Sequence, residues 1–346
     1  MFRDLARLPG SPHLHRWADW AEALCIYEGM LTAPDLSTEV EKRADSLHVE
    51  AEDDVEPGLG GVESLKTPFK SDAEFSDAVT QRASDTFALL AARAAEYGDQ
   101  YPFELDDAGR RLTLRNLQPN RGLYLFLLTC STFRYLDDAA TQTDLAGRFE
   151  WLSLQALRAQ LPARAEVHLF GANPQPGARY DVGLRDRVRR LGGDIREELL
   201  IDVDREFPSD SGDNGLDLVG WLDQPDASPG LAISFGQCAC TPQWVSKQHS
   251  SSHAAWNPAF RFTVPPANFC FIPFDFRGTD GDWYLRTSIQ GSVVIDRRRL
   301  LKTVGLADSH GELIALDDDV RTQLNLEGFM NLLQHFDWPA ALVSGD

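Results

Sequence analysis

The sequence lacks several features that would place it in a specialised class of proteins. No apolar run approaches the roughly 20 residues needed to cross a bilayer. The opening stretch, MFRDLARLPGSPHLHRW, has no uninterrupted apolar segment of the kind found in secretory signals. The five cysteines are odd in number and widely scattered, so they do not form a disulfide framework. These absences predict a cytoplasmic protein, kept in a reducing compartment and without a membrane partner.

Positive charge is also scarce. The 33 Lys and Arg residues, only five of them Lys, face 53 acidic residues, which gives a net charge of −20. This balance argues against a broad nucleic-acid surface, because phosphate groups are bound by Lys and Arg. Two local basic runs, LRDRVRR and VVIDRRRLLK, still allow nucleic acid to bind at a single site.

With 346 residues, the chain is too long for one small core, and its patterning predicts two units. Residues 1–140 are predicted to be a mainly helical N-terminal unit, with helices over residues 13–31, 76–98 and 122–136. A hairpin is expected around the turn DDAG, between YPFEL and RRLTLR. The strongly acidic stretch at about residues 39–72 is predicted to be a linker or mobile loop.

The pattern changes after Asp144. An amphipathic helix, short buried strands and further helices alternate through residues 141–346. The expected elements are a helix at 147–162, a strand at 165–171, a helix at 182–193, strands at 215–222 and 231–238, helical structure within 241–256, strands at 268–276 and from 292, and helices up to 305 and at 324–336. This order predicts a mixed α/β domain.

Two polar residues fall inside the predicted buried strands: Asp217 in GLDLVGW and Gln237 in FGQCAC. Side chains alternate between the two faces of a strand, so pairing of these strands lets both project to one side. A buried carboxylate is costly unless it is paired or holds a metal. Together with a helical carboxylate, these two groups would offer oxygen ligands to Mg²⁺, a hard cation.

At these residues the chain resembles the PD-(D/E)XK nuclease superfamily, whose fold is restriction-endonuclease-like, over roughly residues 145–280. The resemblance implies a core of order α-β-β-β-α-β. In that family an Asp lies on the second strand, Glu or Gln followed by any residue and Lys lies on the third, and a Glu often comes from the first helix. It therefore implies that Glu150, in RFEWLSLQAL, joins Asp217 and Gln237 in binding Mg²⁺.

One position departs from the family pattern, because Ala239 stands where the lysine is expected. Some members carry this lysine on the following helix, and Lys247 lies ten residues after Gln237 in such a segment. The resemblance implies a Mg²⁺-dependent DNA endonuclease, of a kind often found in prokaryotic restriction or anti-phage systems with protein partners. Lys247 would orient or deprotonate the attacking water, and the metal would stabilise charge on the phosphoryl oxygens.

Several alternatives remain open. Ala239 and the acidic net charge also suit a catalytically inactive scaffold or nucleic-acid sensor on the same fold. Cys240 with a nearby histidine would suit a cysteine hydrolase. Cys238, Cys240, His249 and His253 could instead form a zinc site. Each of the four candidate residues can also be explained without a function, as a charged surface residue or as a buried polar group with hydrogen-bond partners. Asp213, in SGDNG, is predicted to be a turn residue.

Overall fold

The computed structural model describes residues 5, 8–9, 13–46, 71–116, 118–136, 138–171, 177–307, 313–316 and 318–329. These residues divide into two compact units. The first unit takes its described residues from Met1–Gln142, Phe274–Tyr284 and Arg321–Asp346, and the second from Thr143–Pro273 and Leu285–Val320. The boundary predicted after residue 140 lies close to the observed one. The chain then returns to the first unit twice, so residues 141–346 do not form one uninterrupted domain.

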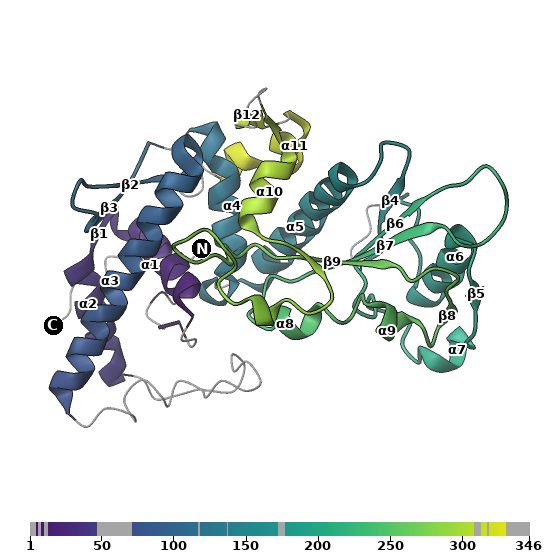
Figure 1. The fold of residues 1–346 in the computed structure, drawn as a ribbon, viewed down its shortest axis with the longest axis horizontal. Helices are drawn as coiled ribbons and strands as arrows, with labels where there is room; N and C mark the ends of the chain where they lie inside the picture. The colour runs from purple at the N-terminus through teal and green to yellow at the C-terminus, as the bar shows by residue number, and fades with distance from the viewer. Residues whose placement is uncertain are drawn as a thin grey trace. The chain divides into compact units, whose positions relative to one another are not determined.

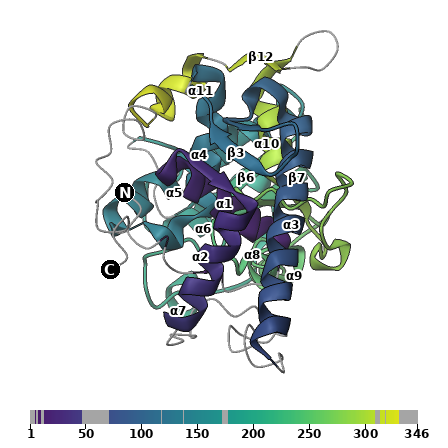
Figure 2. The same ribbon diagram turned by 90° about the vertical axis from the view of Figure 1, so that its left-hand side faces the viewer.

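The first unit is built mainly from helices (Figures 1 and 2). Its elements are α1 (Leu14–Glu28), β1 (Met30–Thr32), α2 (Ala33–Ser46), α3 (Asp72–Tyr97), β2 (Phe103–Leu105), β3 (Arg111–Leu114) and α4 (Gly122–Ser131). The three strands form an antiparallel sheet of order β1-β3-β2. Gly29, at φ 76°, ends α1 in the left-handed conformation that glycine adopts readily. The predicted helices and the predicted hairpin are therefore present, while β1 replaces the last residues of the first expected helix.

The acidic stretch was predicted wrongly in its first part, because residues 39–46 belong to α2. Leu36 and Val40 are spaced four residues apart and both are buried, so one face of this helix packs inward. Next to this face, the half-buried Arg43 pairs with the half-buried Glu39 at 2.7 Å. Acidic and basic residues spaced four apart can pair along a helix, so a strongly charged stretch is compatible with a helix as well as with a linker. Residues 47–70 lie outside the described part of the chain.

A buried charge cluster occupies the core of the first unit. The Arg93 guanidinium lies 2.8 Å from Asp19, 3.0 Å from Glu22 and 3.1 Å from Asp275. Two tyrosine hydroxyls each donate to Glu22 at 2.8 Å. All four charged residues are buried, and the attraction between them offsets the cost of removing them from water. The cluster joins α1, α3 and the returning segment Phe274–Tyr284.

The second unit is built around a mixed five-stranded sheet (Figure 1). Its helices are α5 (Ala139–Gln160, which begins in the first unit), α6 (Leu184–Ile195), α7 (Val203–Glu206), α8 (Trp244–Lys247), α9 (His253–Trp256) and α10 (Arg297–Val304). Its strands are β4 (Glu166–Leu169), β5 (Glu198–Leu199), β6 (Leu218–Leu222), β7 (Ala232–Cys238), β8 (Phe260–Arg261), β9 (Ala267–Phe271) and β10 (Val293–Ile295). The predicted mixed α/β architecture is confirmed. No described helix has both the length and the apolar character needed to cross a membrane.

The strand order of this sheet is β10-β9-β7-β6-β4. Strands β4, β6 and β7 pair antiparallel, whereas β7 with β9 and β9 with β10 pair parallel. Parallel neighbours need a crossover connection, and the one from β7 to β9 carries α8 and α9. One face of the sheet packs Val219, Trp221 and Phe235 into a core with side chains of α6 and Trp256 of α9.

Several short elements of the second unit were not predicted, among them α7, β5 and β8. Each spans four residues or fewer, which is too short for a periodic pattern to show. The helical structure expected within 241–256 is divided between α8 and α9. Near the end of the described chain, β11 (Gly305–Ala307) pairs antiparallel with β12 (Leu313–Leu316), and α11 (Asp318–Gln323) follows. Of the helix predicted at 324–336, residues 326–329 are helical and residues 330–336 lie outside the described part.

Candidate functional site

Asp217 lies immediately before β6 and is held by the main chain on both sides. Its N–H donates to Gly236 O of β7 at 3.0 Å. Its carbonyl accepts from Phe170 N at 2.7 Å and from Gly171 N at 3.0 Å, just after β4. Asp217 is only 3% exposed, so its carboxyl group is buried as the sequence predicted. The central strands of the sheet therefore fix the position of this residue.

One oxygen of the Asp217 carboxylate is occupied by β7. Oδ2 accepts hydrogen bonds of 2.6 Å from Gln237 Nε2 and 2.6 Å from the Cys238 N–H. Leu218 pairs with Gly236 in the antiparallel register, which places Asp217 directly opposite Gln237. The structure therefore brings these two predicted site residues together on one side of the sheet.

Gln237 turns its amide nitrogen, rather than its oxygen, toward Asp217. Nε2 also donates to Cys238 O at 3.0 Å, while Oε1 accepts from Ser250 Oγ at 2.9 Å. The sequence led us to expect an amide oxygen directed at a cation. In this conformation Gln237 instead orients the carboxylate, and its oxygen faces Ser250.

Glu150, on α5, lies beside Asp217 across Gly171. A Cβ atom at Gly171 would lie 3.2 Å from Glu150 Oε2 and 3.3 Å from Asp217 Oδ1. The carboxylate oxygen of Asp217 that is not bound by β7 therefore faces the same small volume as Glu150. Glycine at this position leaves that volume free of side-chain atoms. No sequence pattern singled out Gly171.

Burial raises the pKa values of both carboxyl groups, and neighbouring acidic side chains raise them further. Burial, and to a smaller extent the Asp213 carboxylate, raises the pKa of Glu150 to about 7. Burial, followed by the charges of Glu150 and Asp213, raises the pKa of Asp217 well above its ordinary value, against the lowering effect of the Cys238 N–H. Like charges in a low-dielectric site favour proton uptake or the binding of a cation.

Asp213 is the third carboxylate of the site. It is a turn residue, as predicted, because its Oδ1 accepts from Gly215 N at 2.7 Å. Gly215 has a φ of 74°, and a Cβ atom there would lie 2.4 Å from Ser250 Cβ, so only glycine allows this turn to approach Ser250. The electrostatic influence of Asp213 on Glu150 and Asp217 was missed. The signal available in the sequence was the short spacing of the two acids in DNGLD.

Arg187, on α6, supports the two loops that carry the site. Its Nη1 donates to Phe170 O at 2.5 Å and to Gly171 O at 2.6 Å, and its Nη2 donates to Gly212 O at 2.7 Å. The residue is 3% exposed, and burial lowers its pKa despite the nearby charge of Asp213. Arg187 therefore uses its donors on main-chain carbonyls and forms no ion pair with the carboxylates among the described residues.

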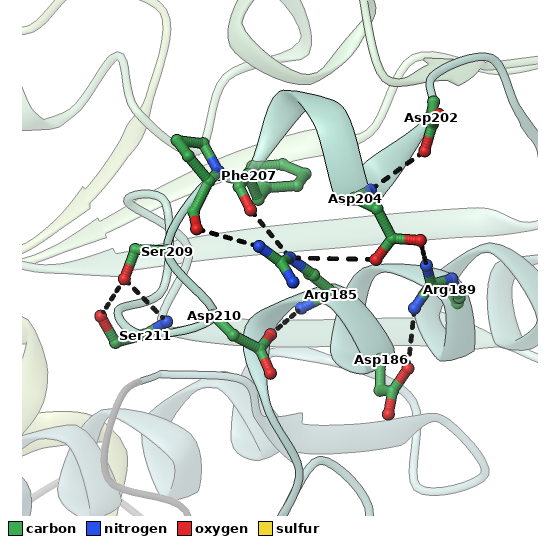
Figure 3. Close-up of polar contacts among 10 residues, drawn as sticks. Arg185, Asp186, Arg189, Asp202, Asp204, Phe207, Ser209, Asp210 and Ser211 are labelled. Atoms are coloured by element: carbon green, nitrogen blue, oxygen red, sulfur yellow. Dashed lines mark hydrogen bonds and ion pairs between the residues drawn. The ribbon is translucent and has the colours of Figure 1, made fainter.

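The segment that leads to the third carboxylate is fastened to α6 (Figure 3). Arg185 Nε donates to Phe207 O at 2.8 Å, and the Arg185 N–H donates to Asp210 Oδ1 at 2.8 Å. Arg189 Nη2 lies 2.6 Å from Asp204 Oδ2. These contacts tie the chain after α7 to the first turns of α6. Helix α6 therefore contacts the loop that contains Gly171, through Arg187, and the segment that leads to the turn at Asp213, through Arg185 and Arg189.

Lys247, the candidate for the displaced lysine, is exposed at the end of α8. Its side chain makes no hydrogen bond or ion pair within the described ranges. Its ammonium group partly offsets the effect of burial, which raises the pKa of the Cys270 thiol to about 12. Cys270 pairs in register with Gln237, so the Lys247 charge acts on the strand next to the site. Ala239, at the lysine position of the family pattern, is fully buried.

The zinc alternative gains no support around Cys238, whereas Cys240, the nucleophile of the cysteine-hydrolase alternative, is half-buried and that alternative stays a prediction. Burial and the neighbouring Asp217 raise the pKa of the Cys238 thiol well above its ordinary value, which disfavours a reactive thiolate. His253 makes a ring contact with Phe262 at 5.5 Å, and His249 is exposed. Within the residues the structure describes, no three His, Cys, Asp or Glu side chains are grouped as a ready metal centre.

The residues around Gly171 nevertheless suit a hard divalent cation. The donor set is made of carboxylate oxygens, which Mg²⁺ prefers. A cation between Glu150 and Asp217 would relieve the repulsion by which the Glu150 charge raises the pKa of Asp217. The space that a Cβ at Gly171 would fill adjoins an oxygen of each. Asp217 Oδ1 and Glu150 Oε2 are the atoms that would hold the ion.

Comparison of this chain with family models, with curated proteins and with solved structures finds no match.

Proposed function

We propose that the second unit is a PD-(D/E)XK-type, restriction-endonuclease-like domain, and that the protein is a Mg²⁺-dependent DNA endonuclease. The elements α5, β4, β6, β7, α8 with α9, and β9 follow the α-β-β-β-α-β order that the sequence resemblance implies, and this supports the proposal. The elements α6, β5 and α7 are inserted between β4 and β6, and β8 precedes β9. The pairing supports the proposal as well, with two antiparallel steps followed by one parallel step. A role in prokaryotic defence, with protein partners, follows from the resemblance and is part of the proposal.

The observation that carries the proposal is the meeting of Glu150 and Asp217 at Gly171. One carboxylate comes from the first helix of the core and the other from the start of the second strand of the sheet order described above. Glu150 Oε2 and Asp217 Oδ1 lie 3.2 and 3.3 Å from the position that a Cβ atom at Gly171 would take. A buried carboxylate, Asp217, beside a half-buried one, Glu150, costs stability unless a cation or a proton is shared between them.

In this site the chain's own residues would position a phosphodiester and handle a proton. A bound Mg²⁺ supplies charge stabilisation at the phosphoryl group and activation of water. Asp217 is kept in one orientation by the Gln237 amide and the Cys238 N–H. Glu150 Oε2 would be a ligand of the ion, and without the ion the same carboxyl group, with a pKa of about 7, holds a proton below neutral pH. Lys247 would place its charge at the rim, beside a phosphate.

The proposal is tested by cleavage of supercoiled plasmid DNA in the presence of Mg²⁺. Asp217→Asn keeps the size of the side chain and an oxygen that accepts from the Cys238 N–H, but it removes the charge. We expect this variant to lose cleavage while keeping its fold by circular dichroism. Asp107→Asn, an exposed carboxylate in the hairpin turn of the first unit, serves as the matched control and should cleave normally. Equal cleavage by wild type and Asp217→Asn removes Asp217 from the chemistry.

A catalytically inactive scaffold or nucleic-acid sensor is the second candidate. Two observations favour it: Ala239 is fully buried at the lysine position, and Gln237 offers its nitrogen to Asp217. It predicts DNA binding that is unchanged by Asp217→Asn, together with no Mg²⁺-dependent cleavage by the wild type. Filter binding and plasmid cleavage on the same preparations separate the two candidates.

A further inference from the structure

The acidic residues of this chain are distributed unevenly along the sequence. The chain holds 53 Asp and Glu residues in 346, so a segment of 47 residues would contain about seven of them if they were spread evenly. Residues 227–273, a segment of that length, contain none, and residues 285–295 contain none either. Both segments belong to the second unit. A surface built from them lacks the acidic side chains found elsewhere in the chain, so it repels a polyanion less.

The two acid-free segments meet at Gln248, a fully buried residue that follows α8. Its Nε2 donates to Ser288 O at 2.8 Å. Its Oε1 accepts from the Gln290 N–H at 2.8 Å and from Ser292 Oγ at 2.9 Å. These three hydrogen bonds fasten the loop of residues 286–292 to the end of α8.

Two cationic residues lie beside this junction. Lys247 directly precedes the buried glutamine, and Arg286 lies two residues before the carbonyl that the glutamine binds. Both residues are exposed. Ser250 Oγ lies 2.7 Å from Lys247 O and 2.9 Å from Gln237 Oε1, so the end of α8 is also connected to the candidate site. The junction therefore places two cationic residues on segments next to the acidic site.

The two basic runs of the sequence are used differently, since several of their arginines serve the fold. Arg189 of α6 pairs with Asp186 at 2.9 Å and with Asp204 at 2.6 Å (Figure 3). Arg297 of α10 is fully buried, and its Nε donates to a main-chain carbonyl at 2.9 Å. Arg299 likewise donates to a carbonyl, at 2.7 Å. A count of arginines in the sequence therefore does not locate the surface that binds an anion.

The exposed side chains at the junction suit phosphates better than bases. Single strands are held largely by stacking of bases on aromatic rings, whereas the phosphates of a duplex accept from Lys, Arg, hydroxyl and amide groups. Within residues 241–256 and 285–292 the aromatic rings are Trp244 and Trp256, which are 2% and 1% exposed. The exposed polar side chains on either side of Gln248, which we call the α8–loop surface, are Lys247, His249, Arg286, Thr287 and Gln290.

We propose that the α8–loop surface binds the phosphate backbone of duplex DNA, with Lys247 and Arg286 each contacting one phosphate. This inference deepens the function proposed above and rests on it, since the surface would hold the duplex beside the candidate metal site. Arg286 has no place in the family pattern, so its contribution is separate from that of a displaced lysine. Binding through phosphates needs no metal ion and reads no base sequence.

Fluorescence anisotropy with a labelled duplex of about 20 base pairs, in EDTA and at 50–200 mM KCl, tests the proposal. Lys247→Gln and Arg286→Gln should each weaken binding about five- to tenfold at 100 mM KCl and lower the salt slope by about 0.9. Lys247→Arg keeps the charge and should keep the wild-type slope. Arg261→Gln is the matched control, because this exposed arginine of the same acid-free segment already pairs with Glu198 at 2.8 Å. Its affinity should change less than about twofold.

The outcomes separate this surface from the proposed nuclease. A duplex of different base sequence should bind equally well, and a single strand of the same length should bind more weakly. The surface is overturned if the Lys247→Gln and Arg286→Gln variants keep wild-type affinity, if the single strand binds more tightly, or if the wild type binds no duplex at 50 mM KCl. Plasmid cleavage by the wild type would then leave the nuclease standing. Weakened binding by both variants, without Mg²⁺-dependent cleavage by the wild type, supports the surface and overturns the nuclease.

Discussion

Replacing Glu150 by glutamine should make the protein more stable at alkaline pH than the wild type. Burial and the Asp213 charge raise the pKa of Glu150 from 4.5 to about 7 in the folded state. A raised carboxyl pKa means that the folded state holds the proton more tightly than the unfolded chain does. This contribution to stability is fully present below pH 4.5 and is lost as pH rises through 7.

The magnitude follows from the change in pKa. Each factor of ten in proton affinity is worth about 1.4 kcal/mol, so a rise from 4.5 to about 7 corresponds to about 3 kcal/mol. Most of this, about 2.5 kcal/mol, is lost between pH 5 and pH 8. Glutamine does not ionise, so Glu150→Gln should lack this loss. It should also relieve Asp217, whose pKa the Glu150 charge helps to raise, which increases the difference from the wild type.

Urea unfolding at pH 5, 6, 7 and 8 in the presence of EDTA measures the effect. The wild-type curve should fall more steeply with pH than that of Glu150→Gln, while Glu198→Gln, which alters an exposed glutamate, should follow the wild type. Added Mg²⁺ at pH 8 should stabilise the wild type and not Glu150→Gln. If the free energy of unfolding depends on pH in the same way for the wild type and Glu150→Gln, the folded protein does not raise the pKa of Glu150 and the reasoning is refuted.

Three further substitutions test the surrounding structure. Gly171→Ala should change the free energy of unfolding by less than about 1 kcal/mol but weaken Mg²⁺ binding at least tenfold by calorimetry, because its methyl group enters the space between the two carboxylates; unchanged affinity would place the cation elsewhere. Arg93→Met should cost about 3–5 kcal/mol in urea unfolding, since it leaves three buried acids without their arginine; a cost under 1 kcal/mol would contradict this. Arg187→Lys should cost about 1–3 kcal/mol, because lysine cannot reach three carbonyls at once, and retained wild-type stability would show that the two loops hold themselves.

The parts of the structure that follow a periodic pattern could be predicted from the sequence. Alternation along β6 and β7 placed Asp217 and Gln237 on one side, and the antiparallel register confirms that they face each other. Helical spacing gave α1, α3 and α5 to within a few residues at most ends. These features arise from local backbone geometry, which the order of apolar residues reports directly.

The parts that depend on loops could not be predicted in this way. Gly171, Arg187 and Ser250 join the site through main-chain carbonyls, a missing side chain and a shared hydroxyl. None of these features leaves a period or a charge pattern in the sequence. The orientation of the Gln237 amide is likewise decided by its partners, Asp217, Cys238 and Ser250, rather than by its position on the strand. The residue types show which hydrogen-bond donors and acceptors are present at the site. Only the contacts in the structure show which atom of each side chain bonds to which partner.

The two units differ in how they neutralise their clustered acids, of which Asp217 is buried and Glu150 and Asp213 are half-buried in the second unit. In the first unit three buried carboxylates surround Arg93 at 2.8–3.1 Å, so the chain supplies its own counter-charge. In the second unit no lysine or arginine of the described part pairs with Glu150, Asp213 or Asp217, and the nearest support, Arg187, donates to carbonyls instead. Within the described residues, the acidic cluster of the second unit therefore has no ion pair, and the chain's own positive charge acts on it only through the longer-range attraction between Arg187 and Asp213. Below about pH 7 a proton on Glu150 lowers the negative charge of this cluster, and above it a divalent cation is the partner that the oxygen donors fit best.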